Sequence, residues 1–224
     1  MAHIHLEDGA FSPFWVLVWS LAAAGVVSLA LLSLGRGKIS PRKLAIAAMC
    51  TSVGFAVFQV SIPIFGGIHL NLTPLIGILA GPGLGSLAVL VINIFSAAVG
   101  HGGWGMIGAN TLVNVAEVLV GYYVYRLMKK NLKADRFFSG LAAGVIALSL
   151  SALLIIAIVV VSGVQDSAAT AEETAGNMLL IGVANIVAGV IEGLITGYVV
   201  AFIGRTRPDL LADAEGAPAK GTEG

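Results

Sequence analysis

The sequence predicts an all-α integral membrane protein, and three observations support this fold class. The chain has 224 residues, of which 58% are hydrophobic and only 11% are charged. Soluble domains carry about 25% charged residues, so this composition excludes an ordinary soluble protein. The apolar residues also form stretches close to the roughly 20 residues that a transmembrane helix needs. The net charge of zero gives no indication of a nucleic-acid partner.

About seven apolar segments are expected to form transmembrane helices. The third and fourth are short and are separated only by Gly81-Pro82-Gly83, which allows steep tilting or a re-entrant course. These segments are expected to form one polytopic membrane domain, residues 1–207. The polar, Ala/Gly-rich residues 208–224 are expected to be a disordered cytoplasmic tail. The segments are residues 14–34, 43–62, 71–80, 84–99, 107–127, 138–161 and 178–203.

The distribution of charge predicts the orientation in the membrane. All twelve Lys and Arg residues follow the first, fifth and seventh segments, and therefore fall on one side. Basic loops face the cytoplasm, so the N-terminus is predicted to be outside and the C-terminus in the cytoplasm. The outer face then holds all four histidines, which are His3, His5, His69 and His101.

The N-terminal residues Met1-Ala2-His3-Ile4-His5 could chelate a transition metal. Because Ala2 is small, removal of Met1 is expected. The Ala2 amine, the His3 amide nitrogen and the His3 ring would then supply three donors in one plane, and His69 could fill the fourth position. If Met1 is retained, the peptide closes four positions by itself. Such nitrogen-rich sites favour Ni(II), Cu(II) and related ions. The alternative is a solvated tail with incidental histidines.

Two glycine-rich loops carry the remaining histidines. His69 follows Gly66-Gly67-Ile68, and glycine lets a backbone approach a ligand closely; the alternative is a plain turn with an imidazole at headgroup level. His101 lies in Gly100-His101-Gly102-Gly103, shortly before Asn110. We expect His101 to hydrogen-bond to a ligand of the metal rather than bind the metal itself. Met1, His5 and Asn110 are expected to be auxiliary in the same way.

Glu117 and Glu192 lie inside apolar segments, where ionisable groups are costly and are candidates for function. We interpret them as members of a buried polar network, together with Asn93 and Gln59, rather than as metal ligands.

Taken together, these motifs resemble the CbiM/NikM family, the substrate-binding membrane components of cobalt and nickel energy-coupling-factor transporters. The similarity covers residues 1–115 in order and spacing. Its motifs are His3-Ile4-His5-Leu6-Glu7-Asp8-Gly9, Ile68-His69-Leu70, Leu79-Ala80-Gly81-Pro82 and His101-Gly102-Gly103 followed by Ile107-Gly108-Ala109-Asn110.

The resemblance implies that the metal is held by the N-terminal amine, the amide and ring of the next histidine, and the histidine between two spans. These positions correspond to Ala2, His3 and His69. Counting back from Asp8-Gly9 would select His5 instead, whereas the amine chelate requires His3. The resemblance also implies a transmembrane coupling subunit, a pair of cytoplasmic ATPases, and no chemistry in this chain.

The sequence thus predicts a multi-pass protein of the cell membrane that captures Co(II) or Ni(II) at its outer face for ATP-driven uptake. It is expected to be neither an enzyme nor a cofactor-binding protein, and the sequence does not choose between the two metals. The alternatives are an intramembrane metalloenzyme, which would need a carboxylate to activate water, and a vitamin-binding component of the same transporter type. A passive channel would work without ATP. The chain has no Walker A motif, so ATP hydrolysis by that route falls to partner chains.

Overall fold

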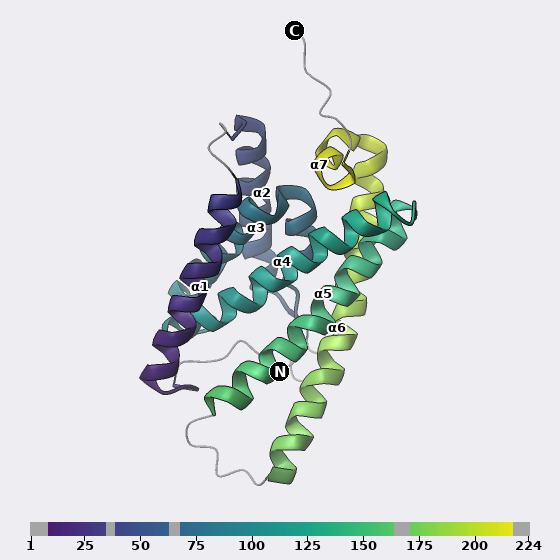
Figure 1. Ribbon diagram of the computed structural model, residues 1–224. Helices are drawn as coiled ribbons and strands as arrows, with labels where there is room; N and C mark the ends of the chain where they lie inside the picture. The colour runs from purple at the N-terminus through teal and green to yellow at the C-terminus, as the bar shows by residue number, and fades with distance from the viewer. Residues whose placement is uncertain (1–8, 35–38, 63–67, 164–170, 217–224) are drawn as a thin grey trace.

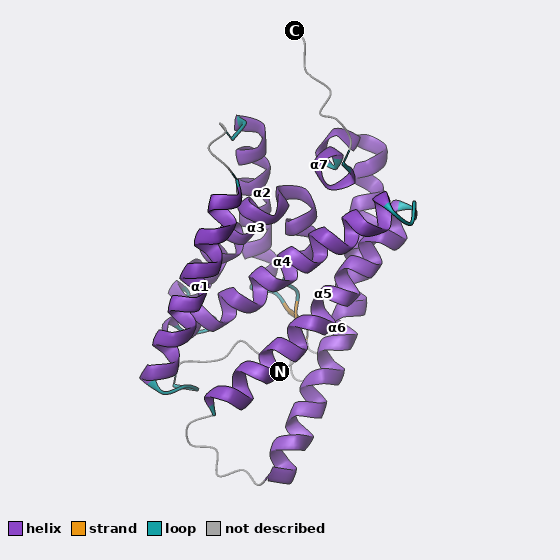
Figure 2. Ribbon diagram, viewed as in Figure 1, coloured by secondary structure: helices purple, strands orange, loops and turns teal. Residues whose placement is uncertain are grey.

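The computed structural model describes residues 9–34, 39–62, 68–163 and 171–216. The expected all-α class is confirmed, since helices form nearly all of the described chain and the only strands in it are two short pieces (Figures 1 and 2). The elements are α1 (Pro13–Ser33), α2 (Pro41–Phe58), β1 (Ser61–Ile62), β2 (Ile68–His69), α3 (Thr73–Ala98), the 3-10 turn η1 (Trp104–Met106), α4 (Ile107–Lys130), α5 (Arg136–Ser162), α6 (Ala171–Thr206), the 3-10 turn η2 (Pro208–Leu210) and α7 (Ala212–Glu215).

Local sequence signals fix where several helices begin. Pro13, Pro41 and Pro74 each lie in the first turn of a helix, where a missing N–H costs no hydrogen bond. The hydroxyl of Ser40 accepts a hydrogen bond from the amide of Lys43, and Asp135 caps α5 in the same way. The helices therefore begin close to the segments expected from the apolar runs.

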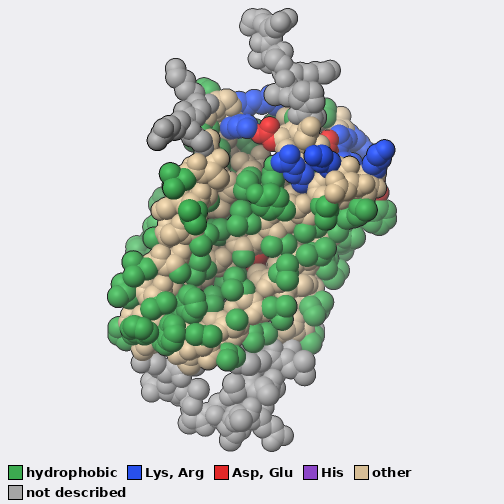
Figure 3. Space-filling model, in the orientation of Figure 1, with side chains coloured by type: hydrophobic (Ala, Val, Ile, Leu, Met, Phe, Trp, Pro, Cys, Tyr) green, Lys and Arg blue, Asp and Glu red, His purple; other side chains and the backbone are tan. Residues whose placement is uncertain are grey.

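Six helices among the described residues are long and apolar enough to cross a membrane. The sides of the molecule are covered by exposed hydrophobic side chains, and the described Lys and Arg side chains gather at one end (Figure 3). In water such a surface would be unfavourable, whereas against lipid it is expected. We refer to the end that carries the Lys and Arg residues as the basic end.

Helix α3 is folded back on itself. The chain breaks from helical geometry at Gly81, with φ 79° and ψ 171°, and Pro82 follows. A Cβ added to Gly85 would lie 3.5 Å from the Cα of Gly77, which is possible only because the two halves run side by side. The expected third and fourth segments are therefore the short arm (residues 73–80) and the long arm (residues 83–98) of one helical hairpin.

The short arm cannot cross the membrane on its own. At about 1.5 Å per residue it rises about 12 Å, compared with about 30 Å for the hydrocarbon core. Six of the described helices are long enough to cross, so the expected count of about seven spans is not confirmed, and the re-entrant alternative describes this region better. Because the short arm still returns the chain to the end that carries Lys43 and Arg126, the predicted placement of the two termini on opposite sides does not depend on this count. Because the hairpin tip lies at the basic end, beside Lys43 and Arg126, the beginning of the short arm lies deep inside the bundle.

Glycines allow the helices that surround this hairpin to pack closely. A Cβ on Gly121 of α4 would lie 2.7 Å from the Cα of Pro74, and one on Gly144 of α5 would lie 2.5 Å from the Cα of Gly193 of α6. Small residues at such positions let helix backbones approach each other in a membrane. The short arm of α3 packs against the three helices α4, α5 and α6.

The sequence predicted a disordered tail from residue 208 onward, but the structure is ordered up to residue 216. Residues 208–216 form η2 and α7, which pack on the basic end of the bundle (Figure 1). Leu211 and Ala214 are completely buried, and Glu215 is paired with Arg136. Polar composition indicated disorder, but two buried apolar side chains and one partly buried ion pair hold this segment in place. The remainder of the expected tail, residues 217–224, lies outside the described residues.

Candidate metal site

The segment that carries His69 enters the helical bundle between α2 and α3. His69 pairs with Ser61 in the two-stranded antiparallel sheet, which lies at mid-height of the bundle (Figure 2). Leu72 then adopts a left-handed conformation with φ 52°, and α3 begins at Thr73. His69 was expected in a turn on the outer face. It lies deeper, because the short arm of α3 starts in the middle of the bundle.

The structure brings His69 and His101 together from different parts of the chain. Their ring centroids are 4.5 Å apart and their planes meet at 78°. The backbone amide of His101 donates to the carbonyl of Ser96 at 2.8 Å, which places its ring, and Phe58 packs against the far side with a ring-centroid distance of 5.2 Å. Nδ1 of His69 and Nε2 of His101 are both buried. Two imidazoles therefore lie in edge-to-face contact within the bundle.

The surroundings of the two rings favour neutral imidazole. Burial lowers the pKa of His69 below its usual value, although a hydrogen bond to the backbone of Phe58 partly opposes this shift. Burial and then the nearby charge of His69 lower the pKa of His101. A neutral imidazole has a lone pair that can bind a metal, whereas a protonated one does not. Metal-bound imidazoles usually donate their other ring N–H to a carbonyl or carboxylate, and the bond to Phe58 has this form.

A layer of buried polar groups lies directly beyond His69 along the chain. Oε1 of Glu192 accepts a hydrogen bond from the amide of Asn71 at 2.7 Å, and Oε2 accepts one from the amide of Leu72 at 3.1 Å. The hydroxyl of Thr73 donates to the carboxyl group of Glu117. Asn71, Thr73 and both glutamates are almost fully buried. The interpretation of the two glutamates as members of a polar network therefore fits the structure.

A second polar network joins α3 to α4. The amide of Asn114 donates to Oδ1 of Asn93 at 3.1 Å, and the amide of Asn93 donates to the hydroxyl of Thr111 at 3.2 Å. Gln59 donates to the hydroxyl of Ser96 at 3.1 Å, next to the carbonyl that holds His101. Asn110, expected to be auxiliary to the metal, donates to the carbonyl of Gly102 at 3.4 Å and so supports the His101 loop.

The remaining predicted ligands lie outside the described residues. Met1, Ala2, His3 and His5 belong to residues 1–8. Within residues 9–34, 39–62, 68–163 and 171–216, no group of three or more His, Cys, Asp or Glu side chains could hold a metal ion. The described part of the site consists of His69 and His101, and a complete coordination shell needs donors from elsewhere, which the predicted N-terminal amine and His3 would supply.

Sequence reasoning missed Asn71 and Thr73, which fix the segment after His69. Asn71-Leu72-Thr73-Pro74 was visible as a polar break before an apolar run, and a proline at the second position of this helix is a start signal. The partners of these residues lie on α4 and α6, however, and no local signal in the sequence pairs Asn71 with Glu192.

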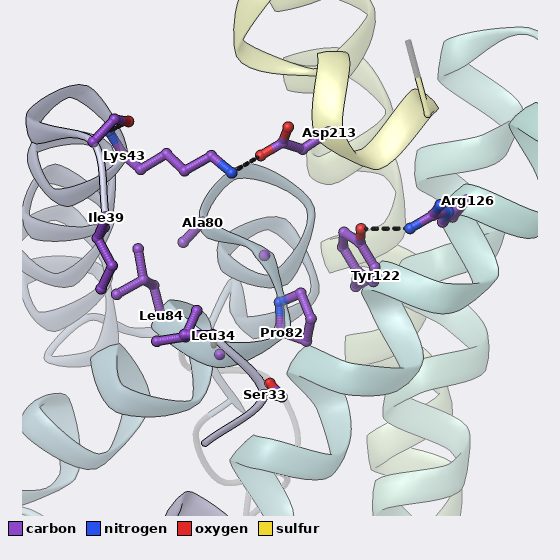
Figure 4. Close-up of a pocket in the computed structure, with 13 residues that line it drawn as sticks. Ser33, Leu34, Ile39, Lys43, Ala80, Pro82, Leu84, Tyr122, Arg126 and Asp213 are labelled. Atoms are coloured by element: carbon purple, nitrogen blue, oxygen red, sulfur yellow. Dashed lines mark hydrogen bonds and ion pairs between the residues drawn. The ribbon is translucent and has the colours of Figure 1, made fainter. Parts of the chain in front are cut away.

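A cavity of about 480 Å³ lies at the other end of the α3 hairpin. Figure 4 shows Pro82 and Ala80 at the hairpin tip, with Lys43 of α2 reaching across to Asp213 of α7 and Arg126 of α4 bonded to Tyr122. This cavity is at the basic end and is separated from His69 by the short arm. It belongs to the cytoplasmic side if the positive residues face the cytoplasm.

Comparison with known proteins identifies the family. The family model described as the cobalt uptake substrate-specific transmembrane region, CbiM, matches residues 5–210. This chain belongs to the CbiM family. Members of this family are substrate-specific membrane components of transporters and not enzymes, so the predicted transport class and multi-pass membrane location are confirmed.

Individual relatives agree with this assignment. A protein of Haloquadratum walsbyi named for metal transport is 31% identical over 212 residues, which are 93% of each chain. A fused protein of Archaeoglobus fulgidus named NikMN for nickel transport is 29% identical and covers 97% of this chain and 70% of its own. The cobalt transport protein CbiM of Sorangium cellulosum is 25% identical over 93% of this chain and 94% of its own.

The fold is also similar to that of solved structures. The crystal structure of a truncated transition metal transporter superposes with a TM-score of 0.78 at 24% identity, over 91% of this chain and 99% of that one. A second transition metal transporter gives a TM-score of 0.76 at 23% identity and covers 91% of this chain and 93% of its own. These similarities support the arrangement of helices described above.

Proposed function

We propose that this protein captures Co(II) or Ni(II) from the outer side of the membrane through the Ala2 amine, the His3 amide and ring, and the ring of His69. The observation that supports this proposal is the contact of the His69 ring with the His101 ring, 4.5 Å apart between centroids, within a bundle of the CbiM family. Imidazole and amide nitrogens suit both metals, and relatives are named for cobalt and for nickel.

We assign His101 a supporting role. Its ring meets that of His69 edge to face, so it fixes the orientation of the ligand and shields it from water. Asn110 supports His101 in turn through the carbonyl of Gly102. His5 and Met1 keep the auxiliary role that was expected from the sequence. Imidazoles and amides that support a metal ligand without binding the metal commonly affect affinity strongly.

Delivery of the metal is driven by partner chains in this proposal. The family is defined as a substrate-specific component, and the sequence contains no Walker A motif, so a coupling membrane subunit and cytoplasmic ATPases would supply the energy. The basic end faces the cytoplasm by the positive-inside rule, which places the N-terminus outside. The helical bundle acts as one membrane domain in this proposal, with residues 208–216 packed on its basic end.

The test is a metal-content measurement on the purified chain, combined with the intact mass of its N-terminus. We expect one Co(II) or Ni(II) per chain. Uptake into vesicles should occur only when the coupling subunit, the ATPases and ATP are all present. A chain that binds neither metal would contradict the capture site, and uptake by the chain alone down a gradient would contradict ATP-driven delivery.

A further inference from the structure

The carboxyl group of Glu192 binds the backbone of the segment that carries His69. Its two oxygens accept hydrogen bonds from two successive amides, those of Asn71 and Leu72, at 2.7 and 3.1 Å. Glu192 is on α6 and completely buried, and these amides lie only two and three positions after His69. The contact therefore joins the last long helix to the loop that carries the candidate ligand.

The backbone at this point needs an external partner. Leu72 has φ 52°, in the left-handed region that is unfavourable for a residue with a branched side chain. Asn71 and Leu72 precede the first turn of α3, so helical hydrogen bonds do not use their amides. In a bilayer interior, a buried amide without an acceptor is strongly unfavourable, because no water is available to replace the lost hydrogen bond. Glu192 supplies both acceptors.

His69 is thus held on both sides. At its own position it is held by the strand pairing with Ser61, which continues to the preceding residue Ile68, and by the hydrogen bond of its ring to the backbone of Phe58. On its C-terminal side, Glu192 fixes the next two amides after Leu70, and Thr73 is bound to Glu117. Between these two anchors the backbone of His69 has little freedom, so the direction of its imidazole depends on both.

We propose that Glu192 is a positioning residue for metal capture, which sets the direction of the His69 ring through the Asn71 and Leu72 amides without touching the metal. This inference rests on the proposed role of His69 as a ligand. It explains why a carboxyl group is present on α6 at a depth where an ionisable side chain is costly. A purely structural contact between α6 and α3 would stabilise the bundle but would leave the metal coordination unchanged.

The test compares Glu192→Gln with Glu117→Gln in the full chain. The Gln at position 192 has one carbonyl oxygen for two amides, so one amide loses its partner. Glu117 is hydrogen-bonded to side chains, those of Thr73, Asn71 and Ser151, and the Gln at position 117 still offers them an oxygen while the backbone amides of Asn71 and Leu72 keep Glu192. We expect Glu192→Gln to weaken Co(II) binding about 10- to 100-fold, the usual effect of removing a group that orients a ligand. It should also change the ligand-field absorption bands of bound Co(II). Glu117→Gln should show a clearly smaller loss and the unaltered bands.

A second variant covers the case in which Glu192→Gln fails to fold. Glu192→Asp keeps the acid but shortens its reach by one methylene, so it should show the same loss of affinity and altered bands. In the metal-free protein, hydrogen exchange at the Asn71 and Leu72 amides should accelerate in both position-192 variants. Normal affinity and unaltered Co(II) bands in a folded position-192 variant would overturn the inference, as would equal losses at positions 117 and 192.

The exchange measurement separates this inference from the proposed function. A wild-type chain that binds no metal would overturn the metal site itself and, with it, the role of Glu192 in capture. A wild-type chain that binds Co(II) normally, with Glu192 variants that exchange faster yet bind equally well, would overturn only the positioning role and leave the metal site in place.

Discussion

The imidazole rings of His69 and His101 meet edge to face, with their centroids 4.5 Å apart. The two residues come from loops at opposite ends of the α3 hairpin sequence, and the fold of this hairpin brings them together. Only one of them needs to bind the metal for the contact to matter, because the second ring fixes the first and excludes water from it.

His69→Ala should abolish stable binding of Co(II) and Ni(II), because it removes the only ligand proposed within the described residues. His101→Ala should weaken binding about 10- to 100-fold, as expected for a group that orients a ligand. Isothermal titration of the purified variants measures both effects, and thermal unfolding in detergent checks that each variant is folded. Unchanged affinity in folded His69→Ala would remove His69 from the site, and a greater loss in His101→Ala would exchange the two roles.

A short N-terminal extension should weaken metal binding even when every histidine is retained. The chelate needs the terminal amine next to His3, and additional residues convert that amine into an amide. Intact mass should show that Met1 is absent, since Ala2-His3 leaves one planar position for His69. His3→Ala should reduce affinity more than His5→Ala. An extended protein that binds as tightly as the native one would rule out the amine chelate, and greater damage from His5→Ala would select the register counted from Asp8-Gly9.

Most of the helices could be predicted because their signal is local. Continuous apolar runs set the spans, and Gly81-Pro82 marked the break that proved to be the tip of a hairpin. The depth of His69 could not be predicted, because it depends on the short arm packing inside the bundle. The bond between Glu192 and Asn71 joins residues 121 positions apart, and no pattern along the chain specifies that pairing.

For the C-terminal residues, the sequence predicted disorder where the structure contains packed helical turns. Residues 208–224 are rich in Ala, Gly and charge, a composition that is typical of disorder. Leu211 and Ala214 nevertheless find a buried surface beside Tyr125, and Arg136 binds Glu215. A few long-range contacts were enough to order residues 208–216, and composition averaged over the whole tail does not detect them.

Cysteine labelling should confirm the orientation given by the basic end. In a chain with Cys50 replaced, Asn131→Cys at the end of α4 should react with an impermeant reagent only from the cytoplasmic side. Ser167→Cys, in the acidic stretch predicted outside, should react only from the other side. The reason is that all twelve Lys and Arg residues follow the first, fifth and seventh predicted segments, and positive loops stay in the cytoplasm. The reverse labelling pattern would place the metal site on the cytoplasmic side.

Gly144→Val should destabilise the bundle by separating α5 from α6. A Cβ at this position would lie 2.5 Å from the Cα of Gly193, so two backbones have to move apart. Overpacking of this kind costs about 1–3 kcal/mol, enough to lower the thermal unfolding temperature measurably. Ala157→Val is the matched control, since it adds the same kind of bulk to an exposed position of α5. Equal unfolding temperatures for the two variants would mean that the α5–α6 contact does not limit stability.

The C-terminal segment should be released by Glu215→Gln or by low pH. Glu215 accepts two hydrogen bonds from Arg136, at 2.7 and 3.0 Å, and one from the hydroxyl of Tyr125 at 3.0 Å. Burial alone would raise the pKa of Glu215, but the hydrogen bonds and charge of Arg136 outweigh it and lower the pKa below the usual 4.5. Hydrogen bonds to charged groups contribute about 1.5–3 kcal/mol, so loss of the carboxylate should free α7.

The sign of the pH effect follows from the lowered pKa. A carboxyl group whose pKa is lower in the folded state than in the unfolded state stabilises the fold fully when the pH is above the unfolded-state pKa. This contribution is lost as the pH falls through the folded-state pKa. We therefore expect η2 and α7 to stay bound at neutral pH and to detach only in acid, as the pH falls below the ordinary glutamate pKa of 4.5. Labelling of Leu211→Cys, in a chain without Cys50, reports this release because Leu211 is completely buried.

Asp213→Asn is the control: its ion pair with Lys43 is exposed, and such pairs contribute about 0–1 kcal/mol. If Asp213→Asn exposes position 211 as much as Glu215→Gln does, the pair with Arg136 is not what holds the segment in place.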